Sequence, residues 1–276
     1  MSYTNASSLV STEWLAAHLD DPKVKVIDST GDGRKAFLEA HIPRAVFFDF
    51  DEIADRHTDL LHMLPPPELF AEKVGALGIG NDDHVVAYDS SPLSSGARGW
   101  WMFRVFGHDR VSLLDGGLPR WTAEGRPAES GQVAPAPARY KAGFRPELVR
   151  SIEQLLANVE TGEELVVDAR AAERFAGRGK EKHPTRHLGH IPHSVNVPYT
   201  DLLEGDDHRF RTSDELERIF DKAGVDARQP VVTSCGSGVT ACVVALGLHL
   251  LGHDRVAVYD GSWSEWGNRD DTPVET

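Results

Sequence analysis

The sequence predicts an α/β protein built from two tandem domains of one type, each a parallel sheet with helices on both faces. Short β-branched runs alternate with helix-like stretches along the chain, which is typical of parallel sheets covered on both sides. The same short motifs recur in the same order in both halves and indicate a duplicated unit. A proline- and alanine-rich stretch at 132–139 separates the halves and suits an extended linker.

The individual elements follow from hydrophobic periodicity and from helix start signals. The predicted strands are 24–28, 84–88, 110–114, 165–168, 230–234 and 256–259. The predicted helices are 12–19, 67–77, 99–106, 151–159, 213–222 and 239–251, several of which open on Ser, Thr or Pro.

The internal repeat fixes the predicted domain boundaries. Gly-His-Asp-Arg-Val occurs at 107–111 and 252–256, Asp-Gly with a following Trp at 115–121 and 260–266, and His-Ile-Pro at 41–43 and 190–192. We therefore expect an N-terminal domain over 1–131, a linker over 132–145 and a C-terminal domain over 146–276.

Composition excludes several classes of protein. The formal charge of −14 argues against extensive nucleic-acid binding, and no apolar run approaches the roughly 20 residues that cross a bilayer. The N-terminal residues lack a secretory signal pattern, and two cysteines fit a reducing compartment, so we expect a cytoplasmic protein with no membrane partner. The histidines at 183, 187, 190 and 193 are interrupted by Pro and Gly, so we expect no metal and no cofactor.

Cys235 is the strongest candidate for a nucleophile. It follows a predicted strand and precedes Gly-Ser-Gly and an apolar helix. Two nearby glycines let successive N–H groups turn inward, and the helix places its positive end below them, which together stabilise a thiolate. A buried structural thiol is the alternative, and it describes Cys242 within the apolar helix better.

The first half supplies an internal comparison. Asp89 follows the strand that corresponds to 230–234, where the second half has Cys235. The loop after it, 90–96, is longer and contains a proline. We therefore expect an inactive N-terminal copy that forms a wall of the cleft, with the active copy at the C-terminus.

On these residues the chain resembles the tandem-domain rhodanese superfamily, and most closely its 3-mercaptopyruvate sulfurtransferase branch. The motifs that carry the resemblance are Cys-Gly-Ser-Gly-Val-Thr-Ala at 235–241, Gly-Ser-Trp-Ser-Glu-Trp at 261–266, Gly-His-Ile-Pro at 189–192 and Trp-Trp-Met-Phe-Arg at 100–104. The resemblance implies that Cys235 takes a sulfur from a donor as a persulfide. It passes that sulfur to a thiol, with thioredoxin as a candidate, or to cyanide. The Gly-Ser-Gly loop favours 3-mercaptopyruvate as donor, and thiosulfate is the alternative.

The resemblance also assigns site residues. It implies that Arg174 and the loop residues Gly236, Gly238, Val239 and Thr240 bind the donor. His183 stands where mercaptopyruvate enzymes carry a second arginine, and the basic residues 178, 180, 182 and 186 are close enough in sequence to replace it.

An Asp-His-Ser relay is the further element that the resemblance implies, and here it would consist of Asp51, His62 and Ser237. Ser237 would donate to the donor's oxygen, with His62 as proton source and Asp51 orienting the ring. The alternatives are a turn histidine and a helix cap. Arg98 and Arg104 are weaker candidates, with Arg104 as a brace between domains.

Two other functions use a similar loop. A phosphatase would need an arginine at the end of the loop, but the sixth residue after Cys235 is Ala241 and the next arginine is Arg255. A non-catalytic rhodanese-like binding module is the remaining alternative.

Overall fold

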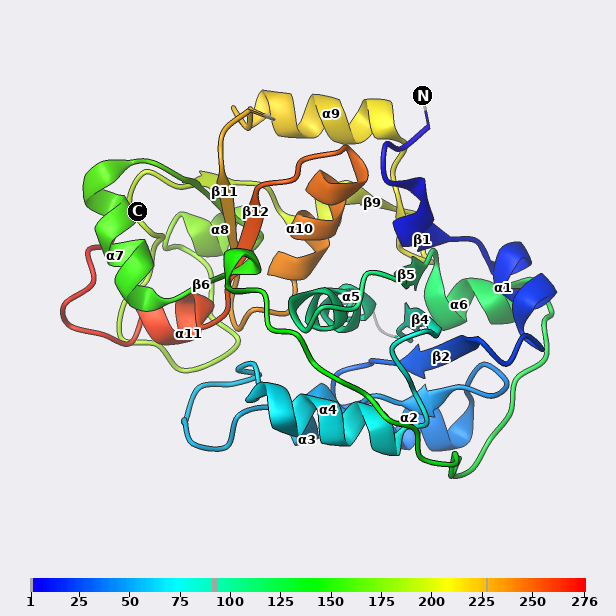
Figure 1. The fold of residues 1–276 in the computed structure, drawn as a ribbon. Helices are drawn as coiled ribbons and strands as arrows, with labels where there is room; N and C mark the ends of the chain where they lie inside the picture. The colour runs from blue at the N-terminus through cyan, green and yellow to red at the C-terminus, as the bar shows by residue number, and fades with distance from the viewer. Residues whose placement is uncertain (1, 91–93, 227) are drawn as a thin grey trace.

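Each half of the chain forms a five-stranded parallel sheet, as the sequence predicts (Figure 1). The computed structural model describes residues 2–90, 94–226 and 228–276. The first sheet has the order β1 (Leu9–Val10), β5 (Val111–Leu114), β4 (His84–Tyr88), β2 (Val24–Asp28), β3 (Val46–Phe47). The second has the order β6 (Val149–Arg150), β12 (Val256–Tyr259), β11 (Val231–Ser234), β7 (Leu165–Asp168), β8 (Val195–Asn196). The equivalent strands occupy equivalent places, so the repeat in sequence is a repeat in topology.

Side-chain alternation buries both faces of each sheet. In β4, Val85 and Ala87 pack into one hydrophobic cluster, whereas Val86 and Tyr88 pack into another on the opposite face. This period of two, with apolar residues at every position, is why the runs are strands covered on both sides.

Helices cover the inner faces, where the halves meet, and the outer faces. The inner helices are α3 (Phe50–Ile53), α4 (Pro67–Ala76), α5 (Gly96–Val105), α9 (Ser213–Lys222) and α10 (Ala241–Leu250). The outer helices are α1 (Thr12–His18), α2 (Arg34–Glu39), α6 (Gly117–Ala123), α7 (Ile152–Thr161) and α11 (Ser262–Trp266). The short elements are α8 (Ala172–Phe175), the antiparallel pair β9 (Leu203–Glu204) and β10 (Arg209–Phe210), and 3-10 turns at Ala6–Ser8, Pro146–Leu148 and Tyr199–Leu202. Helices α5 and α10 pack against each other between the sheets and join the two inner cores into one cluster (Figure 1).

Local signals explain where the helices begin and end. Ser151 caps α7 in a capping box with Gln154, and Gly162 ends the helix in the left-handed conformation. Thr212 and Glu215 form the same box at α9. The two-residue strands β1, β3, β6 and β8 were not predicted, because two residues are too few to show a period.

The repeat also joins the halves reciprocally. Asp115 and Asp260 occupy the same position of the recurring Asp-Gly motif. Asp115 Oδ1 accepts from Phe210 N at 2.9 Å, and Asp260 Oδ2 accepts from Leu64 N at 2.7 Å. Each half therefore satisfies a backbone amide of the other with the same aspartate.

The stretch 132–145 forms no helix or strand and runs along the first half, where Ala138 N donates to Gly75 O at 2.8 Å. Residues 91–93 of the longer loop predicted after Asp89 lie outside the described residues. Across the part of the chain that the structure describes, no helix is long and apolar enough to cross a membrane.

Candidate active site between the two halves

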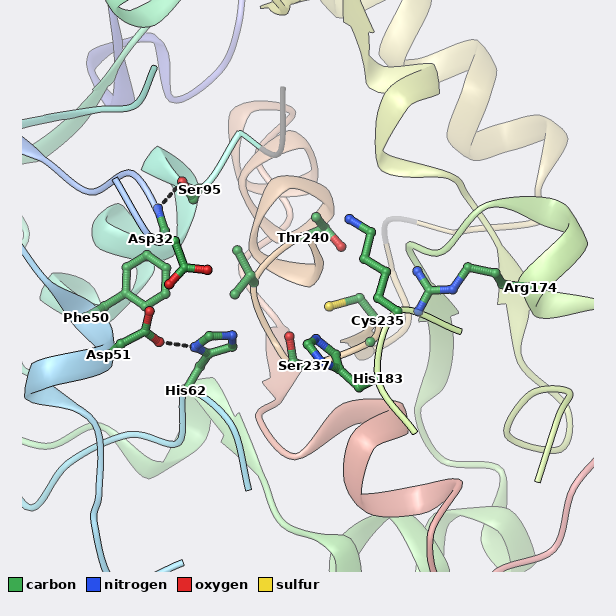
Figure 2. A pocket seen from close by; sticks show the side chains of 14 residues that line it. Asp32, Phe50, Asp51, His62, Ser95, Arg174, His183, Cys235, Ser237 and Thr240 are labelled. Carbon is green, nitrogen blue, oxygen red and sulfur yellow. Dashed lines mark hydrogen bonds and ion pairs between the residues drawn. The ribbon is translucent and has the colours of Figure 1, made fainter. Parts of the chain in front are cut away.

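Cys235 lies at the carboxyl edge of the second sheet, between the end of β11 and the start of α10. Its side chain is 2% exposed and lines a cavity of about 200 Å³ to which both halves contribute. In Figure 2, Cys235, Ser237 and Thr240 face His62 and Asp51 across this space. The cysteine is therefore shielded from bulk water but reachable by a small molecule.

The backbone of the cysteine loop is held from outside. Trp263 N donates to Cys235 O at 3.0 Å, and Ser264 N donates to Gly236 O at 2.8 Å. Within residues 2–90, 94–226 and 228–276, no group accepts a hydrogen bond from the backbone N–H groups of 236–240. The carbonyls of Cys235 and Gly236 are bonded by Trp263 and Ser264. The N–H groups of the loop therefore remain available to an anion near the sulfur.

Gly238 shapes this loop rather than lining the cavity. Its φ is +76°, and a Cβ atom there would lie 2.7 Å from Asp260 O, so only glycine fits without displacing backbone. Its carbonyl accepts from Arg98 Nη1 at 3.2 Å and from Cys242 Sγ at 3.2 Å. Burial raises the pKa of Cys242 to about 12, so this second cysteine remains a thiol.

Arg98 connects the two halves beneath the cavity. It is completely buried, and its Nη1 donates to Asp260 Oδ1 at 2.6 Å while its Nη2 donates to the carbonyl of His62. Burial is the largest single effect and acts to lower the pKa of Arg98, but the Asp260 carboxylate and the other neighbouring groups together raise it. A charged guanidinium therefore holds the His62 segment of the first half against the Gly238 turn of the second.

Asp51 and His62 form the first part of the predicted relay. The Nδ1 atom of His62 is hydrogen-bonded to Asp51 Oδ1, and the ring packs edge-on against Phe50 at a centroid distance of 5.4 Å. Among the side chains that the structure describes, Asp51 alone hydrogen-bonds the ring, and Ser237 stands opposite it (Figure 2). The unbonded Nε2 therefore faces the space that a donor would fill.

Arg174 enters the cavity from the other side. Its Nε donates to Glu181 Oε2 at 2.9 Å, while Arg170 Nη1 donates to Glu181 Oε1 at 2.9 Å. Arg170 is buried, pairs with Asp168 at 2.7 Å and lies over the Trp263 ring at 4.3 Å. Glu181 thus shares its charge between two guanidinium groups and fixes the orientation of Arg174.

Lys182 and His183 complete this wall, and their charges differ. Burial lowers the pKa of His183, with His62, Arg174 and Lys182 adding to the effect, so the imidazole is mainly neutral at pH 7. Lys182 lines the cavity and forms no ion pair within the described parts of the chain. The second positive charge next to Arg174 therefore belongs to Lys182. His183, which stands where the resemblance predicts a second arginine, is mainly uncharged.

The cavity brings together nearly all the residues that the sequence nominates. Its lining includes the predicted Asp51, His62, Arg174, His183, Cys235, Gly236, Ser237, Val239 and Thr240. It also includes Gly31, Asp32, Phe50 and Ser95 of the first half, which sequence reasoning missed. Gly31 and Asp32 follow β2, and the rule that carboxyl ends of parallel strands share one edge would have found them.

Other chemistries fit this site less well. The loop carries no arginine to clamp a phosphate, and the guanidinium that lines the cavity, Arg174, belongs to α8 and not to the loop. No set of three or more His, Cys, Asp or Glu side chains in the described ranges is arranged to hold a metal ion.

Comparison with known proteins agrees with this geometry. The family model of the Rhodanese-like domain matches residues 11–124 and again 151–269. The chain belongs to the rhodanese-like sulfurtransferases. Among members of this family, it is 44% identical to human 3-mercaptopyruvate sulfurtransferase, over 94% of this chain and 91% of the relative. It is 42% identical to the Escherichia coli K12 enzyme of the same name, over 96% of this chain and 97% of the relative. It is also 42% identical to bovine thiosulfate sulfurtransferase, over 98% of this chain and 94% of the relative.

A solved sulfurtransferase shares the architecture. A crystal structure of an Escherichia coli 3-mercaptopyruvate sulfotransferase superposes with a TM-score of 0.84 at 39% identity, covering 93% of this chain and 98% of the other. The relatives named for the two donors have nearly equal identity to this sulfurtransferase, so overall identity does not separate the donors. The predicted linker boundaries, 132 and 145, fall in the segment between the two family matches and stay predictions.

Proposed function

We propose that this protein transfers a sulfane sulfur from 3-mercaptopyruvate to a thiol or cyanide acceptor through a persulfide on Cys235. The observation that carries the proposal is the run of N–H groups at 236–240, which bond no other described residue and follow a shielded cysteine directly in the chain. A persulfide is anionic, and N–H groups without other partners can stabilise such an anion without a metal or cofactor.

The first half-reaction is a displacement at sulfur. The Cys235 thiolate attacks the donor sulfur, a sulfur–sulfur bond forms, and the carbon–sulfur bond breaks. Its electron pair leaves as the enolate of pyruvate, which takes up a proton to give pyruvate. Ser237 donates to the enolate oxygen, and His62, oriented by Asp51, supplies the proton.

The donor's carboxylate is proposed to bind at the wall formed by Arg174, Lys182 and His183. Arg174 is pre-oriented by Glu181, and Lys182 contributes the second positive charge. The imidazole of His183 contributes a hydrogen bond, because its lowered pKa leaves it mainly uncharged. Two cations facing the loop also fit the dianion thiosulfate, which keeps that donor as the second candidate.

The second half-reaction returns the cysteine to its starting state. An acceptor thiolate or cyanide attacks the outer sulfur, the sulfur–sulfur bond breaks, and Cys235 leaves as a thiolate. Thioredoxin is the proposed protein acceptor, and a cytoplasmic location stays a prediction from cysteine usage.

The deciding experiment compares the donors at one acceptor concentration. We expect a higher kcat/KM for 3-mercaptopyruvate than for thiosulfate. The reverse order would assign thiosulfate as the donor and remove the role given to the Gly-Ser-Gly loop.

A mass measurement tests the intermediate itself. After exposure to donor without acceptor, peptide mass spectrometry should find one added sulfur on Cys235 and none on Cys242, whose raised pKa keeps it protonated. The Cys235→Ser variant should gain no sulfur. If Cys235 stays unmodified with both donors, the protein is a binding module and not an enzyme.

A further inference from the structure

A second cavity, of about 130 Å³, lies at the far end of the helix that follows the cysteine loop. The helices α5 and α10 meet there, and side chains from both line it, with residues near the N-terminus and the start of β12. The cysteine loop is at the N-terminal end of α10, whereas this cavity is at its C-terminal end. The two cavities have no lining residue in common among those described.

Arg104 gives this cavity a positive charge that no ion pair neutralises among the described residues. Within the chain as the structure describes it, the guanidinium forms no ion pair, and its one hydrogen bond is from Nη1 to His249 Nε2 at 3.1 Å. An arginine can only donate, so His249 Nε2 accepts and the imidazole is neutral. Burial lowers the pKa of His249 to about 4. Burial also lowers the pKa of Arg104, and the opposing effect of the Asp109 carboxylate does not restore it.

Two further polar groups at the cavity have no partner in the described residues. Trp100 is 2% exposed, yet its Nε1 atom is buried without a hydrogen bond, and so is Nδ1 of His253. The Arg104 guanidinium lies over the Trp100 ring at 5.1 Å. The lining carboxylate, Asp254, belongs to an exposed residue and forms no ion pair with Arg104 in these ranges.

The repeat supplies a comparison for one of these groups. His253 corresponds to His108 in the recurring Gly-His-Asp-Arg-Val motif. His108 is satisfied, because its Nε2 bonds Asp83 O at 3.0 Å and its ring stacks on Tyr140. The corresponding histidine of the second copy lines the cavity, and its Nδ1 is buried without a hydrogen-bond partner among the described residues.

We propose that this cavity is a second binding site, and that its ligand is a small anion with oxygen acceptors, a carboxylate or a sulfur oxyanion. Arg104 supplies the charge. Entry of the ligand would bring its oxygens to the buried Trp100 N–H and His253 ring, which have no hydrogen-bond partner among the described residues. The site does not depend on the sulfur-transfer proposal, because none of its residues touches the cysteine cavity.

The Trp100 indole reports directly on occupancy. In ¹H–¹⁵N spectra of the labelled protein, its Nε1 signal is assigned with Trp100→Phe. Sodium pyruvate and sodium sulfate are then titrated against sodium chloride at constant ionic strength. We expect a saturable shift with one or both oxyanions and not with chloride, and the anion that saturates identifies the class. The indole of Trp121, bonded to Pro127 O at 2.7 Å, should not move.

Variants separate binding from general salt effects. Arg104→Gln should weaken the saturable response at least tenfold, whereas Arg110→Gln, at an exposed arginine that does not line the cavity, should leave it unchanged. Ala245→Leu fills the cavity from α10 without touching the charge and should also abolish the response. The response should persist in Arg174→Gln, which removes the proposed carboxylate-binding arginine of the cysteine cavity.

The proposal is overturned if the Trp100 signal moves linearly with every salt, or if saturation survives both Arg104→Gln and Ala245→Leu. Dispersed spectra and unchanged thermal unfolding of each variant establish that a lost response is not a lost fold.

Discussion

At the residue scale, the charge on Arg174 is balanced before any donor arrives. Glu181 holds it, and Glu181 is itself held by the buried Arg170. Under the proposed function, a donor carboxylate would meet a guanidinium whose orientation is already fixed, which would lower the ordering cost of binding. Motif position could predict Arg174. It could not decide between Lys182 and His183, because that depends on burial and on neighbouring charges from the other half.

Arg174→Ala should impair donor use far more than it impairs folding. A lost guanidinium–carboxylate contact in a desolvated site costs about 2 kcal/mol or more, which is roughly a 30-fold drop in kcat/KM. Glu181 keeps Arg170 as a partner, so no buried carboxylate is orphaned. Steady-state kinetics and urea unfolding measure the two effects, and exposed Arg178→Ala is the matched control. Equal losses in both variants would contradict the assignment.

At the element scale, the proposed nucleophile is positioned by β11, the cysteine loop and the start of α10. The sequence predicted this order of strand, loop and helix, because β-branched, glycine-rich and apolar segments follow one another directly. It did not predict that the Gly238 carbonyl would be bound by Arg98, since that contact spans 140 positions. The local sequence pattern determines the strand, the loop and the helix, whereas the conformation of the loop also depends on a contact from the distant helix α5.

Gly238→Ala should damage the loop beyond the ordinary cost of an alanine with positive φ. That cost is about 1–2 kcal/mol. Gly224→Ala, at φ +78°, should show only this cost, because its Cβ atom would meet nothing within 4 Å. At Gly238 the added Cβ would also press on Asp260 O at 2.7 Å and displace the loop amides. We expect kcat/KM to fall about 10²-fold in Gly238→Ala and to be unchanged in Gly224→Ala. Wild-type kinetics in both would show that the amide positions are unimportant.

At the scale of the whole molecule, the two halves share one inner core and one buried ion pair. Strand order and the repeat could be predicted because hydrophobic periodicity encodes them. The contact of α5 with α10 could not be predicted, because both helices are apolar around most of their circumference. Their hydrophobic periodicity therefore does not indicate which face packs against the other helix. The role of Arg98 was underestimated for the same reason, since its partner Asp260 is in the other half.

Arg98→Met should destabilise the protein strongly. It leaves the Asp260 carboxylate buried without its cation, a change that typically costs about 3–5 kcal/mol. Arg145→Met breaks a partly exposed pair with Asp109 and should cost less than about 1 kcal/mol. Urea unfolding of both variants tests this, and a double variant with Asp260→Asn should recover part of the loss. Similar costs for the two arginines would argue against a buried bridge.

Stability should also depend on pH through Asp115. Burial raises its pKa to about 6 despite the hydrogen bond from Phe210 N, whereas in the unfolded chain it titrates near its ordinary value. Because the folded pKa is the higher one, this contribution is fully present below about pH 4 and is lost as the pH rises through about 6. The loss amounts to at most about 3 kcal/mol for a two-unit shift. Urea unfolding of Asp115→Asn at pH 4.5 and 7 should show a smaller decrease than the parent protein, and an equal decrease would contradict the assignment.

The reciprocal aspartate contacts make the chain the equivalent of a two-fold dimer closed into one polypeptide. Each half contacts the other through the equivalent aspartate, as the two subunits of a dimer with an isologous interface do. The two ends of that interface are nevertheless unequal, because only Asp260 has an arginine. One end is a permanent ion pair beside the cysteine, and the other is a carboxyl that takes up a proton in mild acid. The interface end beside the cysteine loop therefore keeps its charges, whereas the charge at the other end changes between about pH 4 and 7.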